Sequence, residues 1–409
     1  MKQKLFLSFI DQGVISASNF FLIIILARIF DKADFGFISF LLFIGVLINN
    51  IQISLITQPH NVIAANLEKK CYEKYTNGAF GLQLLLIIIL VIISIFIYLL
   101  EHYEMLKLHD DVSFIIFSVF YLTLKQLQDF FRRILFTSSH ISQILISDFI
   151  AYGGGILVLL IVLYFKIYIL YQTIIFITIP FVLSIFFLTL TSKVKYKFNK
   201  KDIQFTFKKS FNFAHWSFLS ALTSWLGTRV FPITLGLLVS MDAVAIYAVL
   251  MNIINTLNPI FFTLTNFLTT VFARVAEKSN LLKQTINVFF ALLPIVLISI
   301  IILIIYPKEI LSFLYGTIYI QYVELLQYIS LSIFLIALAN ILQLYLRATK
   351  NVKYIFTSFL YSSFFSLTIG SYLVYNYHIK GAVLAFILSW IISDTLLSFY
   401  VFKSYKGRI

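Results

Sequence analysis

The sequence predicts an all-α polytopic membrane protein with twelve transmembrane helices. Apolar stretches long enough to cross a bilayer recur along the whole chain, and the short gaps between them alternate between basic and nearly uncharged. A helix needs about 20 apolar residues to cross the hydrocarbon of a membrane. Of the 409 residues, 61% are hydrophobic and 12% are charged, whereas soluble domains carry about 25% charged residues. Little of the chain therefore remains for a soluble domain.

The apolar stretches define twelve expected spans. They are 7–29, 36–59, 76–99, 112–136, 141–164, 168–190, 211–238, 243–270, 285–306, 324–346, 353–375 and 381–402. The first follows Lys2 and Lys4, as the apolar part of a signal peptide would. However, Asp11 and Gln12 interrupt it and no clear small-residue cleavage site follows, so we expect it to be retained as a helix.

Short turns separate some of these spans, and acidic residues mark where the next helix starts. Asp31 and Asp34 precede the second span, and Asp242 precedes the eighth. Carboxylates favour helix N-termini because the helix dipole is positive there. Prolines inside four spans predict bends, since proline removes a backbone hydrogen bond; they are Pro180, Pro232, Pro259 and Pro294.

The basic residues determine the expected orientation. Of the 31 Lys and Arg residues, 23 fall on one set of alternate loops and chain ends, six fall on the other, and Lys125 and Arg229 lie inside spans. Loops rich in Lys and Arg face the cytoplasm. We therefore expect both termini to be cytoplasmic. No folded basic surface carries these charges, so nucleic acid is not an expected partner.

The longest and most basic connector divides the chain in the middle. We predict an N-terminal six-helix lobe at 1–190, a basic cytoplasmic linker at 191–210 and a C-terminal six-helix lobe at 211–409. Residues 26–37 and 235–246 are weakly similar at the same offset. Two six-helix repeats would be related by a pseudo-two-fold axis along the membrane normal, around a central cavity. Chance similarity between apolar helices is the alternative.

Polar stripes on several spans indicate which faces look inward. In the first helix Gln12, Ser16 and Asn19 share a face, and Asn49 lies in the second helix. Asn252 and Asn255 share a face of the eighth. Polar side chains in lipid are costly unless they meet a cavity or a partner. The stripes therefore predict a water-accessible cavity, with hydrogen bonding between helices as the alternative.

Charged residues inside spans are the strongest candidates for a site. Arg229 lies well inside the seventh helix with no acid within a turn on that helix. An arginine there costs about 2.5 to 17 kcal/mol, depending on the reference state. It must therefore meet water, a ligand or an interhelical ion-pair partner.

The fourth helix carries Lys125, Asp129, Arg132 and Arg133. The spacing allows Asp129 to pair with Lys125 and with Arg133, at i−4 and i+4. Arg132 and Arg133 lie at its cytoplasmic end, where they either anchor the topology or bind phosphate bidentately. The intramembrane acids are candidate residues for coupling to a proton or sodium ion; they are Asp11, Asp129, Asp148 and Asp394.

Signatures of enzymes are absent from the sequence. It has no phosphate-binding glycine-rich loop, no His or Cys cluster with metal-ligand spacing and no nucleophile elbow. No loop is large enough for a catalytic domain. We therefore predict a protein that is not an enzyme and that uses no cofactor or metal.

Several segments resemble bacterial polysaccharide flippases of the multidrug/oligosaccharidyl-lipid/polysaccharide exporter superfamily. These are Ser8–Val14 with Asn19, Leu26-Ala27-Arg28, Asp34-Phe35-Gly36, Leu127–Phe136 and Leu346-Arg347-Ala348. The resemblance implies twelve helices in two lobes around a V-shaped cavity. It also implies transport of undecaprenyl-diphosphate-linked O-antigen or capsule repeat units to the outer leaflet, as in lipopolysaccharide synthesis. A polysaccharide polymerase complex is then an expected partner, beside the lipid bilayer and a proton or sodium counter-ion.

The expected substrate site combines cations for a diphosphate with amides for sugars. Its candidate residues are Arg229, Lys125, Arg132, Arg133, Arg28, Asn19, Asn49, Asn252 and Asn255. Two alternatives remain open. A cation-coupled drug antiporter on the same scaffold would favour an acidic cavity, whereas the charges inside these spans lean basic. A polytopic polysaccharide polymerase or ligase would usually display a larger outer loop than this chain has.

Overall fold

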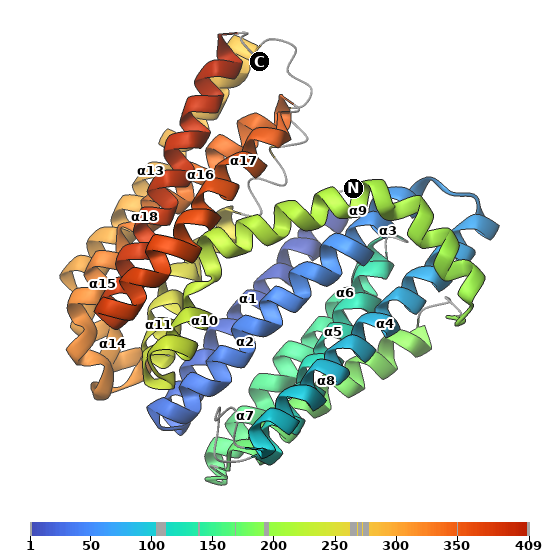
Figure 1. Cartoon of the computed structure of the whole chain (residues 1–409), viewed down its shortest axis with the longest axis horizontal. Helices are drawn as coiled ribbons and strands as arrows, with labels where there is room; N and C mark the ends of the chain where they lie inside the picture. The colour runs from blue at the N-terminus through green and yellow to red at the C-terminus, as the bar shows by residue number, and fades with distance from the viewer. Residues whose placement is uncertain are drawn as a thin grey trace. The chain divides into compact units, whose positions relative to one another are not determined.

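The structure, a computed structural model, describes residues 2–103, 112–137, 140–167, 169–191, 196–261, 268, 272, 278–349 and 351–406. These residues are helical almost throughout, and no strand occurs among them (Figure 1). The chain forms two compact units. Unit 1 contains Met1–Leu22 and Ile44–Leu222, and unit 2 contains Ile23–Phe43 and Thr223–Ile409. Helices α1, α2 and α9 each contribute residues to both units.

Unit 1 contains most of the helices of the N-terminal half. They are α1 (Lys2–Ile29), α2 (Lys32–Gln52) with a π-helical continuation (Ile53–Thr57), α3 (Gln58–Ile63), α4 (Lys69–His102), α5 (Val112–Thr137), α6 (Ile141–Asp148), a π-helical turn (Phe149–Gly153), α7 (Gly154–Tyr164), α8 (Leu170–Thr191) and α9 (Lys200–Arg229). Helix α5 packs against α4, α6 and α8, as Figure 1 shows.

Unit 2 contains the remaining helices. They are α10 (Phe231–Leu238), α11 (Met241–Ile254), α13 (Lys278–Ile305), α14 (Pro307–Tyr315), α15 (Val323–Ser330), α16 (Ser332–Ala348), α17 (Val352–Phe365) and α18 (Ser371–Tyr405). A 3₁₀ segment (Thr317–Tyr322) follows α14, and a π-helical turn (Ser366–Gly370) joins α17 to α18.

The observed helices confirm the prediction of an all-α polytopic membrane protein. Within the described residues, nine helical segments are long and apolar enough to span a membrane, and α9 with α10 would make a tenth. The segment Val352–Tyr405 is interrupted at His378, where φ is 51° and ψ is −129°, so it covers the two spans predicted at 353–375 and 381–402. Helix α5 matches the span predicted at 112–136, although it is not one of those nine segments.

One difference from the predicted elements concerns the start of a helix. The stretch predicted as a linker at 191–210 is helical from Lys200 onward, because α9 begins there. The division into lobes at 1–190 and 211–409 stays a prediction. The span predicted at 243–270 begins with α11, but apart from Leu268 its residues after Phe261 lie outside the described residues.

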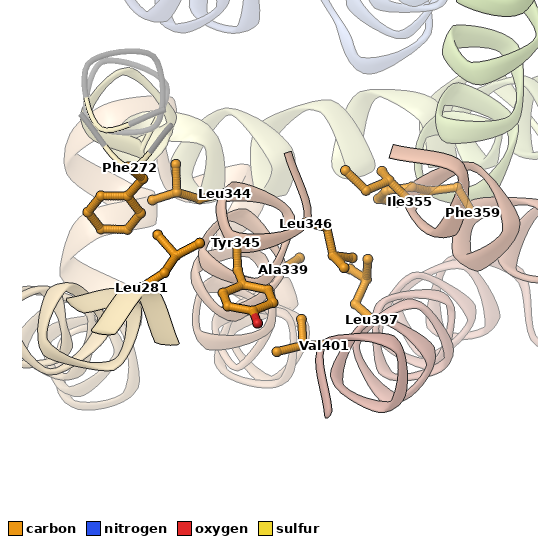
Figure 2. Close-up of a cluster of buried hydrophobic side chains, with 10 residues drawn as sticks. All are labelled: Phe272, Leu281, Ala339, Leu344, Tyr345, Leu346, Ile355, Phe359, Leu397 and Val401. Atoms are coloured by element: carbon orange, nitrogen blue, oxygen red, sulfur yellow. The ribbon is translucent and has the colours of Figure 1, made fainter. Parts of the chain in front are cut away.

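The apolar cores pack between neighbouring helices of each unit. In unit 1 the core joins α5 to α4, α6 and α8 through Phe130, Ile134, Ala79, Ile144 and Leu188. Figure 2 shows a core of unit 2, in which side chains of α13, α16, α17 and α18 converge. Leu281, Leu344, Phe359 and Leu397 all belong to it. Helices in lipid associate largely through such side-chain packing.

The seventh span is broken near its middle. Helix α9 ends at Arg229, and α10 begins at Phe231 with an axis bent by 57°. Pro232 explains the break, because it has no N–H and its ring clashes with the preceding turn. The α9 carbonyls just before the break accept hydrogen bonds from α17 and from the π-helical turn that follows it. Ser366 Oγ donates to the Gly227 carbonyl at 2.8 Å, and Ser363 Oγ donates to the Thr223 carbonyl at 2.6 Å.

Helix starts follow the acidic residues noted in the sequence. Ser240 caps α11, its Oγ accepting from the Ala243 N–H at 3.2 Å, and Asp242 lies in the first turn. At the start of α2, Asp31 Oδ1 accepts from the Asp34 N–H at 2.8 Å. Both arrangements satisfy N–H groups that have no partner within the helix.

Gly36 sets how closely α2 approaches α11 in unit 2. A Cβ atom at this position would overlap the Met241 carbonyl oxygen, which belongs to the backbone. We therefore expect Gly36→Ala to lower the free energy of unfolding by about 1–3 kcal/mol, a typical cost of overpacking. Unfolding of the purified protein in detergent measures it. Gly13→Ala, in α1, is the control, since a Cβ there meets nothing within 4 Å. Equal stability of the two variants would contradict this close approach.

Candidate functional site

Arg132, in α5, lies at the centre of a buried ionic cluster in unit 1. Its Nε donates to Asp148 Oδ2, and its Nη2 donates to Asp11 Oδ2 at 3.0 Å. Its Nη1 lies 3.5 Å from Asp129 Oδ1. Arg132 is 6% exposed, and the exposed fraction of each of the three aspartates is 4% or less. Helices α1, α5 and α6 thus bring together charges that none of them could bury alone.

Further polar side chains complete the cluster. Arg133 Nε donates to Asp129 Oδ2 at 2.5 Å, and Asn49 Nδ2 donates to the same oxygen at 3.0 Å. Gln128 Nε2 donates to Asp148 Oδ1 at 2.8 Å. We call Arg132, Arg133, Asp11, Asp129 and Asp148 the Arg132 cluster. Amides from α2 and α5 supply its remaining hydrogen bonds.

The Arg132 cluster has an excess of negative charge. Three aspartates face two arginines, so the formal charge with every group ionised is −1. Asp11 Oδ1 is buried and has no hydrogen-bond partner among the described residues. An uncompensated buried charge is costly. Uptake of one cation, such as a proton, would make the cluster neutral.

This geometry corrects two expectations about the fourth helix. Asp129 pairs with Arg133 and Arg132, and the described residues show no ion pair between Asp129 and Lys125. The Lys125 Nζ lies 5.8 Å from the centroid of the Tyr121 ring instead. The proposed phosphate-binding role of Arg132 does not fit the structure either, because its guanidinium is already enclosed by three carboxylates.

Arg229 is the other conspicuous cation, and its environment is different. It is the last residue of α9, at the break before α10. The side chain is exposed and makes no hydrogen bond or ion pair with any described residue. The helix C-terminus favours a cation at this position, and the described residues leave the donors of the guanidinium free.

The four asparagines predicted to bind sugar fall into two groups. Asn49 is engaged in the Arg132 cluster, and Asn252 Nδ2 donates to the Tyr315 hydroxyl at 2.8 Å. Burial raises the pKa of Tyr315, so its phenol stays neutral and can accept that bond. Asn19 and Asn255 are exposed. Asn255 accepts from Asn258 Nδ2 at 2.7 Å, whereas Asn19 makes no hydrogen bond with a described residue.

Arg28 has a structural role that the sequence did not indicate. Its Nε donates to the Leu314 carbonyl at 2.8 Å, and its Nη2 donates to the Phe313 carbonyl. These carbonyls lie in the last turn of α14, where they have no partner within the helix. Arg28 therefore caps α14, and its role in binding substrate stays a prediction.

We expect Arg28→Ala to destabilise the protein by about 1 kcal/mol, because a charge-assisted cap of a helix C-terminus is lost. Thermal unfolding in detergent measures this change. Arg28→Lys should retain part of the stability, since an ammonium group still favours that helix end but forms fewer bonds. If Arg28→Ala unfolds like the unmodified protein, the cap contributes nothing.

Asp394 is a second buried acid, in α18 of unit 2. It is 4% exposed, and neither carboxylate oxygen has a hydrogen-bond partner among the described residues. An ionised carboxylate without a partner is unfavourable in such surroundings. The group is therefore suited to holding a proton or a small cation.

The structure also assigns residues that sequence reasoning missed. Gln128 is fully buried, and besides Asp148 it contacts Ser147 Oγ, which pairs with Ser184 Oγ at 2.7 Å. Gln128 lies four residues before Arg132, so the two share a helix face; that spacing was the available signal. The described residues hold no group of three or more His, Cys, Asp or Glu arranged for a metal ion.

Comparisons with known proteins identify the fold. No protein-family profile and no curated protein sequence matches the chain. Solved structures do match. A multidrug resistance MATE family transporter of the MOP superfamily, in an inward-facing conformation, matches with a TM-score of 0.73 and 11% identity, covering 98% of each chain.

Two further structures have the same fold. The lipid II flippase MurJ, in an inward closed conformation, matches with a TM-score of 0.71 and 15% identity, covering 98% of this chain and 87% of that one. A eukaryotic MATE transporter matches with a TM-score of 0.65 and 15% identity, covering 98% of this chain and 95% of that one. The chain therefore has the fold of these transporters.

Proposed function

We propose that this protein is a flippase that moves undecaprenyl-diphosphate-linked oligosaccharide, such as an O-antigen or capsule repeat unit, from the cytoplasmic to the outer leaflet. Arg229 carries the proposal. It is an exposed guanidinium in a membrane span, with no hydrogen bond or ion pair to a described residue. Placing arginine there costs about 2.5 to 17 kcal/mol. A diphosphate would offset that cost, because a guanidinium binds phosphate oxygens bidentately.

The chemistry of such a substrate explains why a protein is needed. A diphosphate with sugars cannot cross hydrocarbon unaided, because its charges and hydroxyls lose their hydration. Arg229 would bind the diphosphate, and exposed amides of the same unit such as Asn255 would bind the sugars. The fold shared with a lipid II flippase supports a lipid-linked substrate. Alternating access would then present the cavity to each leaflet in turn.

Two sites are candidates for coupling transport to a proton or sodium gradient. The Arg132 cluster has one excess negative charge, and Asp394 has two carboxylate oxygens without partners. Either site could take up a cation on one side of the membrane and release it on the other. We place the protein in a bacterial inner membrane with both termini in the cytoplasm, beside a polysaccharide polymerase.

Transport by the purified protein is the direct test. Full-length protein is reconstituted into vesicles that contain an undecaprenyl-diphosphate oligosaccharide with a fluorescent sugar. Dithionite then quenches the fluorescence of the labelled lipid in the outer leaflet. When the flippase is present, dithionite should quench more than the half of the fluorescence that it quenches in protein-free vesicles. Quenching that stops at one half, with correctly folded protein present, would count against the proposal.

A cation-coupled drug antiporter is the second candidate, favoured by the acidic excess of the Arg132 cluster and by the fold shared with multidrug transporters. Expression in a strain without its own efflux pumps separates the two. If the protein is a flippase, its expression should leave the sensitivity of this strain to cationic drugs unchanged. A gain in resistance that is lost in Asp148→Asn would favour the antiporter instead.

A further inference from the structure

The first part of α9 extends beyond the hydrocarbon of the membrane. The helix has 30 residues, and at about 1.5 Å for each residue it is about 45 Å long, whereas the hydrocarbon is about 30 Å thick. Its other end, at Arg229, lies inside the span that α10 continues. The turns that follow Lys200 therefore lie at the membrane surface, on the side that the basic loops assign to the cytoplasm.

One face of these turns is fixed against α4. The Thr206 hydroxyl donates to the Tyr75 carbonyl at 3.0 Å, and the Tyr75 hydroxyl bonds to Ser210 Oγ at 2.5 Å. Gly78 of α4 allows the close approach, because a Cβ there would overlap Thr206 and the Asp202 carbonyl. These contacts fix the rotation of α9 about its own axis, so residues on the opposite face point away from α4.

Lysines cover this opposite face. Lys201 and Lys208 are seven residues apart, so they lie on the same side of the helix, and Lys209 follows directly. We call these three residues the lysine face. All three are exposed, and none forms an ion pair with a described residue. Asp202 is the one acid in residues 197–220, and it is only 8% exposed. The lysine face therefore has no exposed acid beside it on the helix.

Lys74 of α4 adds a cation to the same place. Its Nζ lies 4.6 Å from the centroid of the Phe205 ring, and the Lys209 Nζ lies 5.2 Å from the same centroid. Glu73, the neighbouring acid on α4, forms no ion pair with a described residue. Two ammonium groups thus lie near one ring although they repel each other. An anion bound beside them would offset that repulsion.

Exposed aromatic side chains accompany the lysines. Trp216 lies seven residues after Lys209, on the same side of α9, and is 59% exposed. Phe213 of α9 and Phe198, just before the helix, are exposed as well. Contact of such apolar area with water is unfavourable, whereas aromatic rings fit the boundary between lipid head groups and acyl chains. Lysines combined with exposed aromatics are typical of helices that bind anionic membrane surfaces.

We propose that the lysine face, together with Lys74, binds the head groups of anionic phospholipids in the cytoplasmic leaflet. A lipid is favoured over a soluble anion because this face adjoins a membrane span and carries aromatic rings that would enter the lipid. The inference does not depend on what the protein transports, so it goes beyond the proposed function. Because α9 is one continuous helix as far as Arg229, lipid bound at its start would hold the element that carries the exposed guanidinium.

Quenching of Trp216 fluorescence by brominated lipids tests the contact. The chain has three tryptophans, so Trp225→Phe/Trp390→Phe leaves Trp216 as the sole reporter in the full-length protein. In phosphatidylcholine vesicles, brominated phosphatidylglycerol should quench Trp216 about twofold more strongly than the same fraction of brominated phosphatidylcholine, because lysines concentrate anionic lipid around them. High salt should abolish this preference, since it screens the charges.

A charge-removing variant and a matched control locate the binding. Lys208→Gln/Lys209→Gln should remove the preference, because each lysine at an anionic surface contributes about 1 kcal/mol. Lys308→Gln/Lys380→Gln removes the same charge from exposed positions on the opposite set of loops and should keep it. Native mass spectrometry needs no tryptophan replacement. In that measurement, phosphatidylglycerol bound to the otherwise unmodified protein should fall about tenfold in the first variant only.

Three outcomes would overturn the proposal. Equal quenching by both lipids would show that the face enters the membrane without selecting anionic lipid. Quenching by neither lipid would show that water or another protein covers the face. Loss of the preference in both lysine pairs would show that net charge, and not the lysine face, attracts the lipid. Transport of oligosaccharide is measured separately, so none of these results decides whether the protein is a flippase.

Discussion

Replacing Arg229 with alanine should reduce export of the lipid-linked oligosaccharide by about ten- to a hundredfold while leaving the protein folded. The magnitude follows from the loss of charge-assisted hydrogen bonds worth about 1.5–3 kcal/mol, at about 1.4 kcal/mol for each factor of ten. Stability should change little, because Arg229 makes no hydrogen bond or ion pair with a described residue. Surface polysaccharide in cells and quenching in vesicles measure export, and membrane protein levels measure folding.

A second substitution at position 229 tests whether substrate binding needs only a positive charge or also the bidentate geometry of a guanidinium. Arg229→Lys should restore part of the export if only a positive charge is needed, and none if bidentate binding is needed. Arg347→Ala serves as the matched control, since Arg347 is also exposed at a helix end in unit 2 but bonds to Gln343 Oε1 at 3.1 Å. Normal export by Arg229→Ala would show that the residue does not bind substrate, and would remove the main support for a flippase.

Replacing Arg132 with methionine should destabilise the protein by about 3–5 kcal/mol, the usual cost of breaking a buried ion pair. The three aspartates around it would lose their shared partner while remaining buried. Unfolding of the purified protein in detergent measures the effect. Lys125→Met is the control on the same helix, because Lys125 forms no ion pair among the described residues, and it should cost less than about 1 kcal/mol.

A double variant separates the cluster from a general packing defect. Adding Asp148→Asn to Arg132→Met removes one of the stranded charges, so the double variant should be more stable than Arg132→Met alone. If Arg132→Met destabilised the protein only through poor packing, adding Asp148→Asn would leave the stability unchanged or lower it further. Arg132→Met could instead lower the free energy of unfolding by no more than Lys125→Met does. In that case the cluster does not stabilise unit 1, and groups other than Arg132 must neutralise its carboxylates.

Much of the membrane architecture could be predicted from the sequence. Hydropathy over about 20 residues is a local property, so the positions of the spans follow from composition alone. Acidic helix starts such as Asp242 were also predictable, because a cap depends on only a few neighbouring residues. The break near Arg229 was indicated by Pro232, though its angle depends on what packs around it.

The candidate site could be predicted only in part, since each polar residue has several available partners. The sequence by itself determined the membrane class, the helical spans and which charges lie inside them, because these depend on side chains and their spacing. Only the tertiary structure decided that Arg132 meets Asp11, 121 residues away, and that Arg28 caps a helix 285 residues further on. Such pairs depend on how each helix is rotated and packed, and local sequence does not specify that rotation.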